Sequence, residues 1–356
     1  MFKRNGLHSA NDPLLCPHMK RIAINGYGRI GRNVHRQLLE HYGDSVVVVG
    51  VNASSTSEMR AYLLKYDSLH GKFTGDVEVK DEEHMIVNGQ EVRIVKEKDP
   101  AKCPWKELKV DIVIESTGHF TTTEKASGHI KAGASRVIVT APMKDDTPTF
   151  VLGVNDEGLT GEMPIISNAS CTTNCIAPVI KVMHENFGVA NLLVNSVHAF
   201  TATQNLLDNK GDGNDLRRAR AATLSIIPTK TGAVKACAKI FPELDGKIDG
   251  MAFRVPVPTV SCSYMAFVLE KDASVEEINA VLKKEAKGEL KNVLAVCDEQ
   301  CVSIDFMTDP HSSIVDSTFT KVVDGKTVQL LAWYDNEWGY AMRVTELLQK
   351  VISFMK

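Results

Sequence analysis

The first half of the chain alternates short apolar runs with helical patterns. Residues 21–25 are predicted to form a buried strand, and Ile30, Val34 and Leu38 follow at the four-residue spacing of a helix. The apolar run 46–51 then predicts a second strand. A strand, a helix and a strand within about 30 residues favour a parallel sheet.

The same alternation continues to residue 169. Helices are predicted at 58–66 and 122–133, the second ended by its glycine. The dipeptide Asn88-Gly89 is a turn signal. The strands predicted in this stretch are 77–79, 92–95, 110–115, 136–140 and 150–154.

Longer strand patterns dominate after residue 170, and they lie too close together for strict alternation with helices. They favour a mixed or antiparallel sheet with a few helices. The predicted strands are 190–200, 248–257, 261–270 and 328–334, and the predicted helices are 172–187, 275–287 and 337–355. We therefore predict an α/β protein with a parallel-sheet domain (19–169 and 337–356) and an α+β domain (170–336).

Composition excludes several classes of protein. The 356 residues carry 41 Lys+Arg and 44 Asp+Glu, a net charge of −3, which gives no electrostatic case for binding nucleic acid. Apolar residues make up 44%, enough for a large core, so a disordered chain is excluded. No apolar run approaches the roughly 20 residues of a transmembrane helix.

The cysteines indicate reduced thiols rather than a disulfide or metal framework. Eight cysteines are too few for a disulfide scaffold of this length. The pairs Cys171/Cys175 and Cys297/Cys301 have four-residue spacing, unlike a zinc knuckle, so we expect no metal site and a cytoplasmic protein. Residues 1–18 lack the apolar core of a signal peptide and are predicted to be an extension outside the fold.

A glycine motif follows the first predicted strand. Gly26 permits a tight turn, Gly28 lets the backbone approach a pyrophosphate, and Gly31 lets the helix pack on the sheet. In this context the motif predicts a Rossmann-type dinucleotide-binding domain, the alternative being a glycine-rich turn without a ligand. The second strand ends at Asn52-Ala53, without the usual carboxylate for the ribose hydroxyls, so NADP is permitted.

Three residues in the second domain suggest chemistry. Cys171 lies where small polar residues meet a predicted helix, and thiols at helix N-termini have lowered pKa values; an inert buried thiol is the alternative, and Cys175 is interpreted as structural. His198, at a strand end among hydroxyl residues, is a possible base. Arg254 stands alone in an apolar strand, which indicates an anionic partner, either a ligand or an internal carboxylate.

Together these segments resemble phosphorylating glyceraldehyde-3-phosphate dehydrogenase, from residue 19 to residue 356. The resemblance is carried by residues 25–32, the helix start 170–174, His198 with Thr201, residues 254–256 and residues 333–340. It implies oxidation and phosphorylation of D-glyceraldehyde 3-phosphate with NAD(P) to give 1,3-bisphosphoglycerate. It also implies a homotetramer in central carbon metabolism.

The resemblance assigns roles residue by residue. Cys171 matches the nucleophile and His198 matches its base. The positions that match binding of the substrate phosphate and inorganic phosphate are Ser170, Thr172, Thr201, Arg217, Thr231, Gly232 and Arg254. Those that match cofactor contacts are Gly26, Gly28, Arg29, Ile30, Gly31, Asn52, Lys98, Thr117, Thr140 and Asn336, the last orienting the nicotinamide carboxamide.

Two departures bear on the cofactor. NAD-specific members usually carry Asp where this chain has Ala53, and Lys210 stands near the position of a family proline in a slightly lengthened loop. In the family this loop approaches the adenosine ribose of the neighbouring subunit. The resemblance implies NAD, and the missing acid with a nearby lysine leads to the hypothesis that NADP is accepted as well.

Two other functions remain open from the sequence. Erythrose 4-phosphate dehydrogenase shares the scaffold but ends in hydrolysis, and residues 198–203 match the phosphorylating pattern instead. A surface-adhesion or binding role is the other, with residues 1–18 as its only candidate segment.

Overall fold

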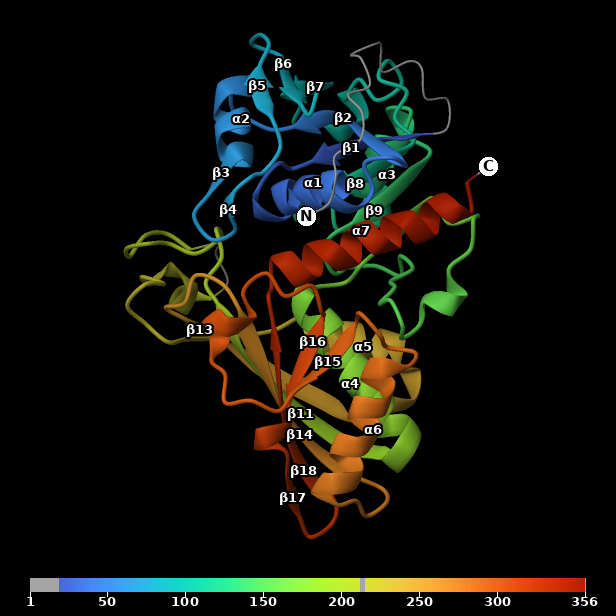
Figure 1. Ribbon diagram of the computed structural model, residues 1–356, viewed down its shortest axis with the longest axis vertical. Helices are drawn as coiled ribbons and strands as arrows, with labels where there is room; N and C mark the ends of the chain where they lie inside the picture. Colours follow the sequence, from blue (N-terminus) through green and yellow to red (C-terminus); the bar gives the residue numbers. More distant parts are fainter. Residues whose placement is uncertain (1–18, 212–214, 356) are drawn as a thin grey trace, which may run out of the picture.

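Two β-sheets, each with its own helices, form two lobes, and the C-terminal helix lies between them (Figure 1). The structure is a computed structural model that describes residues 19–211 and 215–355. The predicted extension 1–18 lies outside the described residues. The predicted α/β class is confirmed, with one largely parallel sheet and one mixed sheet.

The first sheet has the strand order β10-β9-β8-β1-β2-β7-β6-β5. Its parallel strands are β1 (Lys20–Asn25), β2 (Val46–Asn52), β7 (Gln90–Val95), β8 (Ile112–Glu115), β9 (Arg136–Val139) and β10 (Ile165–Ser167). The antiparallel strands β6 (His84–Val87) and β5 (Val77–Val79) extend one edge. Helices α1 (Arg29–His41), α2 (Ser57–Lys65) and α3 (Thr123–Lys131) connect the strands, and a small hairpin of β3 (Tyr66–Asp67) and β4 (Gly71–Lys72) follows α2.

The predicted strand 150–154 is wrong. This segment is a loop, and the edge strand of the sheet is β10, later in the chain. Phe150 and Val151 are apolar because they are buried in the core, not because they belong to a strand. Gly153 has a φ of 75°, in the left-handed region, which ends any extended run.

The second sheet has the order β12-β13-β11-β14-β18-β16-β15, with β17 pairing with β18. Its strands are β11 (Val189–Ala199), β12 (Ile227–Thr229), β13 (Ile248–Val255), β14 (Ser261–Leu269), β15 (Leu294–Cys297), β16 (Ser313–Asp316), β17 (Lys321–Val323) and β18 (Thr327–Tyr334). Helices α4 (Cys171–Phe187), α5 (Ala233–Ile240) and α6 (Val275–Lys287) share one hydrophobic core with this sheet. The pairs β11–β13 and β15–β16 are parallel and the others are antiparallel, so the sheet is mixed.

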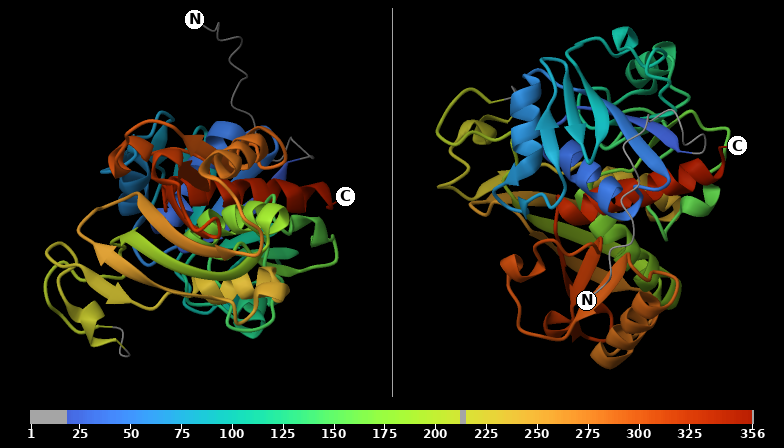
Figure 2. Two further views of the ribbon diagram at one scale, coloured as in Figure 1. Left: turned by 90° about the horizontal axis from the view of Figure 1, so that it is seen from below. Right: turned by 45° about the horizontal axis from the view of Figure 1, so that its top comes forward.

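Helix α7 (Trp338–Ser353) starts just after β18 of the second sheet but packs against the first (Figures 1 and 2). Val344, Leu347 and Leu348 belong to the same core as Val34 and Leu38 of α1. The chain therefore leaves the first lobe near residue 170 and returns to it with its last helix.

The turn between β1 and α1 depends on its glycines. Gly26 has a φ of 90°, which a side chain rarely tolerates. A Cβ at Gly31 would lie 2.2 Å from the carbonyl oxygen of Gly26, so α1 rests directly on the turn. A Cβ at Gly28 would meet nothing within 4 Å.

These contacts predict that only one of two alanine substitutions in this turn destabilises the fold. In a helix, Gly→Ala normally gains about 0.5–1 kcal/mol. In Gly31→Ala the clash with backbone should outweigh that gain and reduce the free energy of unfolding by about 1–3 kcal/mol. Gly28→Ala should leave stability within about 0.5 kcal/mol of wild type. Thermal or urea unfolding measures both, and equal stability of the two variants would contradict the packing described here.

Candidate functional site

Cys171 is the first residue of α4, and its sulfur faces His198. The Ser170 hydroxyl caps this helix by accepting the N–H of Thr173 at 3.1 Å. His198 lies near the end of β11, and its Nε2 is 3.4 Å from the Sγ of Cys171. The fold therefore brings the predicted nucleophile and the predicted base within reach of each other.

Strand β13 places Arg254 behind this histidine. His198 and Arg254 are partners in the parallel β11–β13 pair. Arg254 Nη1 donates to the carbonyl of Ala199 at 3.0 Å, and Nδ1 of His198 is 2.7 Å from the same oxygen. Nδ1 and Nη1 are themselves 2.7 Å apart. The Ala199 carbonyl oxygen has two lone pairs, so it can accept one hydrogen bond from Nη1 and another from an Nδ1–H of His198. We assign this tautomer, which leaves the Nε2 lone pair facing the thiol.

Burial sets the charge state of the pair. It is the main reason that the pKa of His198 is lowered to about 3, and the positive charge of Arg254 lowers this pKa further. Burial also raises the pKa of the Cys171 thiol, while Arg254 and hydrogen bonds at the helix start offset only part of the rise. The sequence predicts a lowered thiol pKa from the helix N-terminus, but here burial outweighs that effect. At neutral pH the pair is a thiol and an uncharged imidazole.

Arg254 has no carboxylate partner within the described residues. Its Nε is buried without a hydrogen-bond partner, and burial lowers the pKa of its guanidinium. Of the two alternatives that the sequence leaves open, a ligand anion and an internal carboxylate, the structure favours the ligand. The guanidinium is available to an anion beside the Cys171–His198 pair.

The other residues predicted to bind phosphate are placed less uniformly. Thr172 is buried, and its hydroxyl bonds the hydroxyl of Tyr334 at 2.9 Å, so only its backbone is free for a ligand. Thr201, just after β11, bonds Thr203 at 3.0 Å. Arg217 is exposed on a short helix and pairs with Asp215 at 2.8 Å, without a contact to Cys171 in the described residues.

Thr231 and Gly232 form the start of α5. The Thr231 hydroxyl accepts the N–H of Ala233 at 3.2 Å, and Gly232 is the N-cap residue of the helix. Gly232 lines a cavity of about 570 Å³ together with Gly118 and Ala141 from the first lobe. This half of the predicted anion site therefore borders the groove between the lobes.

A cavity of about 850 Å³ opens at the carboxyl ends of β1, β2, β7 and β8. This edge of a parallel sheet is where dinucleotides bind in Rossmann-type folds. The cavity fits such a ligand, because Gly28 leaves it open and the turn presents the N-terminus of α1. Its lining comprises Asn25, Gly26, Tyr27, Gly28, Asn52, Ala53, Ser54, Arg60, Lys96, Glu97, Lys98, Ser116, Thr117, His119 and Phe120.

Some predicted cofactor residues contribute in other ways. The guanidinium of Arg29 is held by Asp67 and Glu337, so Arg29, like Ile30, can reach a pyrophosphate only through its backbone at the start of α1. The backbone N–H of Thr140 bonds the carbonyl of Glu115 at 2.9 Å, which fixes the loop after β9.

Asn336 does not line the large cavity, and Ser261 connects it to Ala199, the residue after His198. It is buried, and its Oδ1 accepts the Ser261 hydroxyl at 2.8 Å. This bond fixes the amide and leaves its NH₂ group free to donate.

A buried polar network beneath the cavity is centred on Glu115, His129 and Trp105, which are not among the site residues predicted from sequence. Glu115 ends β8, is fully buried, and accepts hydrogen bonds from Asn25 and Thr117. Nε2 of His129 lies 3.0 Å from the same carboxylate, while Trp105 donates to Nδ1 of His129 at 3.0 Å. A carboxylate at the end of an apolar strand is the same kind of signal as Arg254, and it could have been recognised in the sequence.

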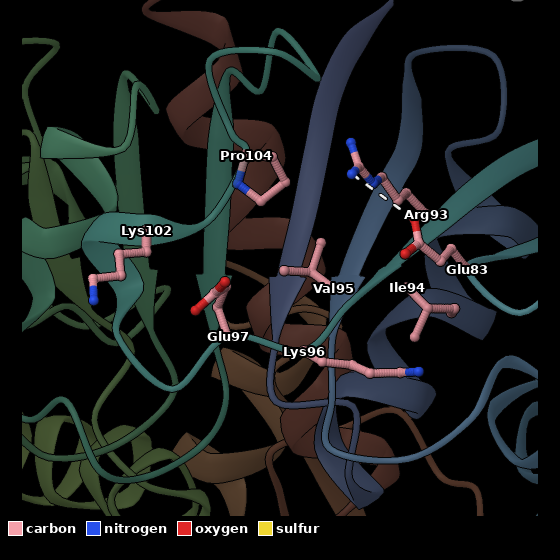
Figure 3. A pocket seen from close by; sticks show the side chains of 8 residues that line it. All are labelled: Glu83, Arg93, Ile94, Val95, Lys96, Glu97, Lys102 and Pro104. Atoms are coloured by element: carbon pink, nitrogen blue, oxygen red, sulfur yellow. Dashed lines mark ion pairs between the residues drawn. The ribbon is translucent and has the colours of Figure 1, made fainter.

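A smaller cavity of about 360 Å³ is lined by the end of β7 and the residues that follow it, together with Glu83, Lys102 and Pro104 (Figure 3). Lys96 and Glu97 line both this cavity and the larger one. In Figure 3 the side chains of Lys96 and Lys102 extend to opposite sides, and the nearby ion pair joins Arg93 to Glu83. Neither Cys171 nor His198 lines this cavity.

No cluster of three His, Cys, Asp or Glu side chains suited to a metal is present in 19–211 and 215–355. Over the same ranges no helix has the length and apolar character needed to cross a membrane. All seven cysteines that the structure describes are free thiols.

Comparisons with family models and with known proteins agree on one family. Residues 20–123 match the family model "Glyceraldehyde 3-phosphate dehydrogenase, NAD binding domain", and residues 170–336 match "Glyceraldehyde 3-phosphate dehydrogenase, C-terminal domain". The chain is 48% identical over 337 residues to glyceraldehyde-3-phosphate dehydrogenase 2 of Bacillus subtilis, covering 94% of this chain and 98% of the relative. It is 49% identical over 332 residues to the Mycobacterium leprae enzyme (92% and 97%). It is 47% identical over 330 residues to the chloroplastic enzyme A of Chlamydomonas reinhardtii (92% and 88%).

The geometry predicts that Arg254→Gln makes the thiol less reactive at neutral pH. Loss of the positive charge should raise the pKa values of both Cys171 and His198, since Arg254 lowers both. The measurement is the pH profile of Cys171 alkylation by iodoacetamide, an uncharged reagent, followed by mass spectrometry of the peptide. The midpoint should move to higher pH. Arg220→Gln is the control, because Arg220 is exposed and paired with Asp208; an identical shift there would refute the electrostatic explanation.

Proposed function

The chain belongs to the glyceraldehyde 3-phosphate dehydrogenase family, and from that premise we propose how its own residues perform the reaction. The enzyme oxidises D-glyceraldehyde 3-phosphate and phosphorylates it to 1,3-bisphosphoglycerate, with a nicotinamide dinucleotide as cofactor. The observation that carries the residue roles is the 3.4 Å contact between Cys171 and His198, with Arg254 behind the histidine.

Cys171 is the nucleophile and His198 its base. As Sγ attacks the aldehyde carbon, Nε2 takes the thiol proton and delivers it to the carbonyl oxygen, which gives a thiohemiacetal on Cys171. A dinucleotide held in the cavity lined by Gly28, Asn52 and Thr117 would supply the hydride acceptor for this carbon. His198 takes the hydroxyl proton at that step, and a thioester on Cys171 results.

Phosphate completes the turnover. An oxygen of inorganic phosphate attacks the thioester carbon, the carbon–sulfur bond breaks, and the imidazolium of His198 returns its proton to the departing sulfur. Backbone N–H groups in the first turn of α4 are placed to stabilise the oxyanion. No residue needs to change its net protonation over the cycle.

Anion binding also prepares the base. A substrate phosphate on Arg254 neutralises the charge that helps to lower the pKa of His198. The pKa should rise when substrate binds, although burial, the larger cause, remains. We propose that Arg254, Ser170 and Thr201 form one anion site, and that Thr231 and Gly232 at the start of α5 form part of the other. Arg217 reaches either site only if its loop moves or a neighbouring chain presents it.

For the cofactor we propose NAD, with NADP accepted as well. Ala53 and Ser54 line the large cavity where a carboxylate would exclude a 2′-phosphate. Lys210 is exposed and does not line that cavity, so its predicted contribution would have to come from a neighbouring chain. The roles of Asn52, Lys98 and Thr117 in cofactor binding are supported by their place in the cavity lining.

We propose that residues 19–169 and 337–356 form the dinucleotide-binding domain and 170–336 the catalytic domain. The core shared by α7 and the first sheet supports this division. We further propose a cytoplasmic location, which the free thiols of the described chain support.

The proposed reaction predicts that turnover requires both inorganic phosphate and Cys171. NAD reduction with glyceraldehyde 3-phosphate should stop when phosphate is omitted, and Cys171→Ser should lower kcat by at least about a thousandfold, as loss of a catalytic nucleophile does elsewhere. Cys297→Ser, which changes a half-buried thiol of β15, is the matched control and should retain activity. Full turnover without phosphate would indicate hydrolysis of the thioester instead.

A homotetramer is proposed from the resemblance and from exposed apolar side chains. The segment 206–226 carries five of them, between 68% and 86% exposed: Leu206, Leu207, Leu216, Leu224 and Ile226. Apolar groups concentrated in this way are typical of an interface. Residues 206–211 and 215–226 project from one side of the second lobe in Figure 1.

We expect wild-type protein to sediment as four chains and Leu216→Asp/Leu224→Asp to sediment as a smaller species, because the charges would be buried in the interface. Analytical ultracentrifugation at one concentration measures both. Tyr62→Asp, at an exposed position of α2, should leave the assembly unchanged. A wild-type protein of one chain would refute the assembly, and an unchanged double variant would exclude this segment from it.

A further inference from the structure

Arg60 is a guanidinium without a counter-ion beside the dinucleotide cavity. It lies in the first turns of α2, the helix that follows β2. Its Nη1 donates to the carbonyl of Tyr27 at 3.2 Å, an oxygen that also accepts Arg32 at 3.0 Å. Its Nε is buried and has no hydrogen-bond partner, and no carboxylate of the described residues forms an ion pair with it.

The surroundings of Arg60 are suited to an anion. The cavity lining contains three basic side chains, Arg60, Lys96 and Lys98, and one carboxylate, Glu97. At the end of β2, where a Rossmann-type domain usually places an acid against the ribose hydroxyls, this chain has Ala53. The described lining of the cavity therefore carries net positive charge beside Ala53.

We propose that Arg60 is a specificity-determining residue that binds the 2′-phosphate of the adenosine half of NADP(H). The proposal rests on the dinucleotide site described under the proposed function. Arg60 lines the cavity, and its Nη2 forms no hydrogen bond with the described residues, so the guanidinium can donate to phosphate oxygens there. Ala53 contributes by removing the negative charge that would repel the phosphate.

Burial makes this interaction more favourable than a surface contact. Desolvation lowers the pKa of Arg60, because the charged guanidinium has lost water without gaining a counter-ion. A phosphate dianion in the cavity supplies that counter-ion. A contact with the pyrophosphate is the alternative, since Arg60 also reaches the Tyr27 carbonyl in the glycine turn. The two alternatives differ in which nucleotides they affect.

The test uses binding, so it does not depend on Cys171 or turnover. Affinities of the purified full-length protein for adenosine 2′,5′-bisphosphate and for 5′-AMP are measured by calorimetry, and those for NADPH and NADH by nicotinamide fluorescence. Arg60→Gln should weaken the two ligands with a 2′-phosphate by about tenfold to a hundredfold, the loss expected for charge-assisted hydrogen bonds. It should leave 5′-AMP and NADH within about threefold of wild type.

Two further variants make the result specific. Ala53→Asp should also weaken the ligands with a 2′-phosphate, by repulsion, while keeping or improving NADH binding. Arg136→Gln is the matched control. Arg136 also bonds only carbonyl groups, but it is the first residue of β9, whereas the cavity opens at the carboxyl ends of the strands. This variant should leave all four affinities unchanged.

Each result bears on the proposal. Equal weakening of all four ligands by Arg60→Gln would assign Arg60 to the pyrophosphate and overturn the proposal, as would no change in any of them. A wild-type protein that binds NADH but neither ligand with a 2′-phosphate would overturn it and leave the proposed reaction intact. Failure of every nucleotide to bind would overturn the dinucleotide site as well.

Discussion

The start of α4 depends on a single strained residue. Ala169 is buried and has a φ of 54°, a left-handed conformation that costs an ordinary residue roughly 1–2 kcal/mol. It is held on both sides: its N–H bonds Ser167 at 2.9 Å, and its carbonyl accepts the hydroxyl of Tyr340 at 3.0 Å. Tyr340 belongs to α7, so the last helix of the chain stabilises the turn that presents Cys171 to the groove between the lobes. Without that turn the helix would not begin at the junction, and its sulfur would not face His198.

The charge states of Cys171 and His198 follow from their burial behind that turn. Burial favours the uncharged forms of both Cys171 and His198, while Arg254 favours a thiolate and disfavours an imidazolium. Burial is the larger effect on each residue, so both are uncharged in the absence of substrate. The thiol proton of Cys171 therefore moves to His198 only as the sulfur bonds to the substrate carbon. The same low-polarity surroundings strengthen any anion contact with Arg254. The second sheet supplies His198 and Arg254 from adjacent parallel strands, and its register fixes their relative positions.

The sequence predicts what local patterns encode. The bounds of α6 are those predicted, and Cys171 and His198 are recognised from a helix start and a strand end. The strand β10 is missed because its three residues are too few to show a period, whereas the buried loop at 150–154 imitates one. Tyr334 and its bond to Thr172 join residues far apart in the chain, and no local pattern indicates such a contact. Arg60 is missed for a related reason, because on a helix surface an arginine usually faces water, and only the path of α2 turns this one toward the glycine turn.

The first lobe shows why a cavity so rich in polar groups keeps its shape. Four parallel strands end at its floor, and there Glu115 takes up donors from Asn25, Thr117 and His129. A buried carboxylate without them would be costly, so each donor is held in place by the penalty of losing it. Asn25 in turn accepts the amide of Asn52 at 2.6 Å, which extends the network from β8 through β1 to β2. The residues that line the cavity thus lie above a network whose buried polar groups are already hydrogen-bonded to one another within the described chain. This leaves Ala53 and Ser54, which follow β2 and lie outside that network, free to differ between enzymes that share it. Selection between the two cofactors can therefore change at this strand end without disturbing the turn, the floor or the catalytic pair.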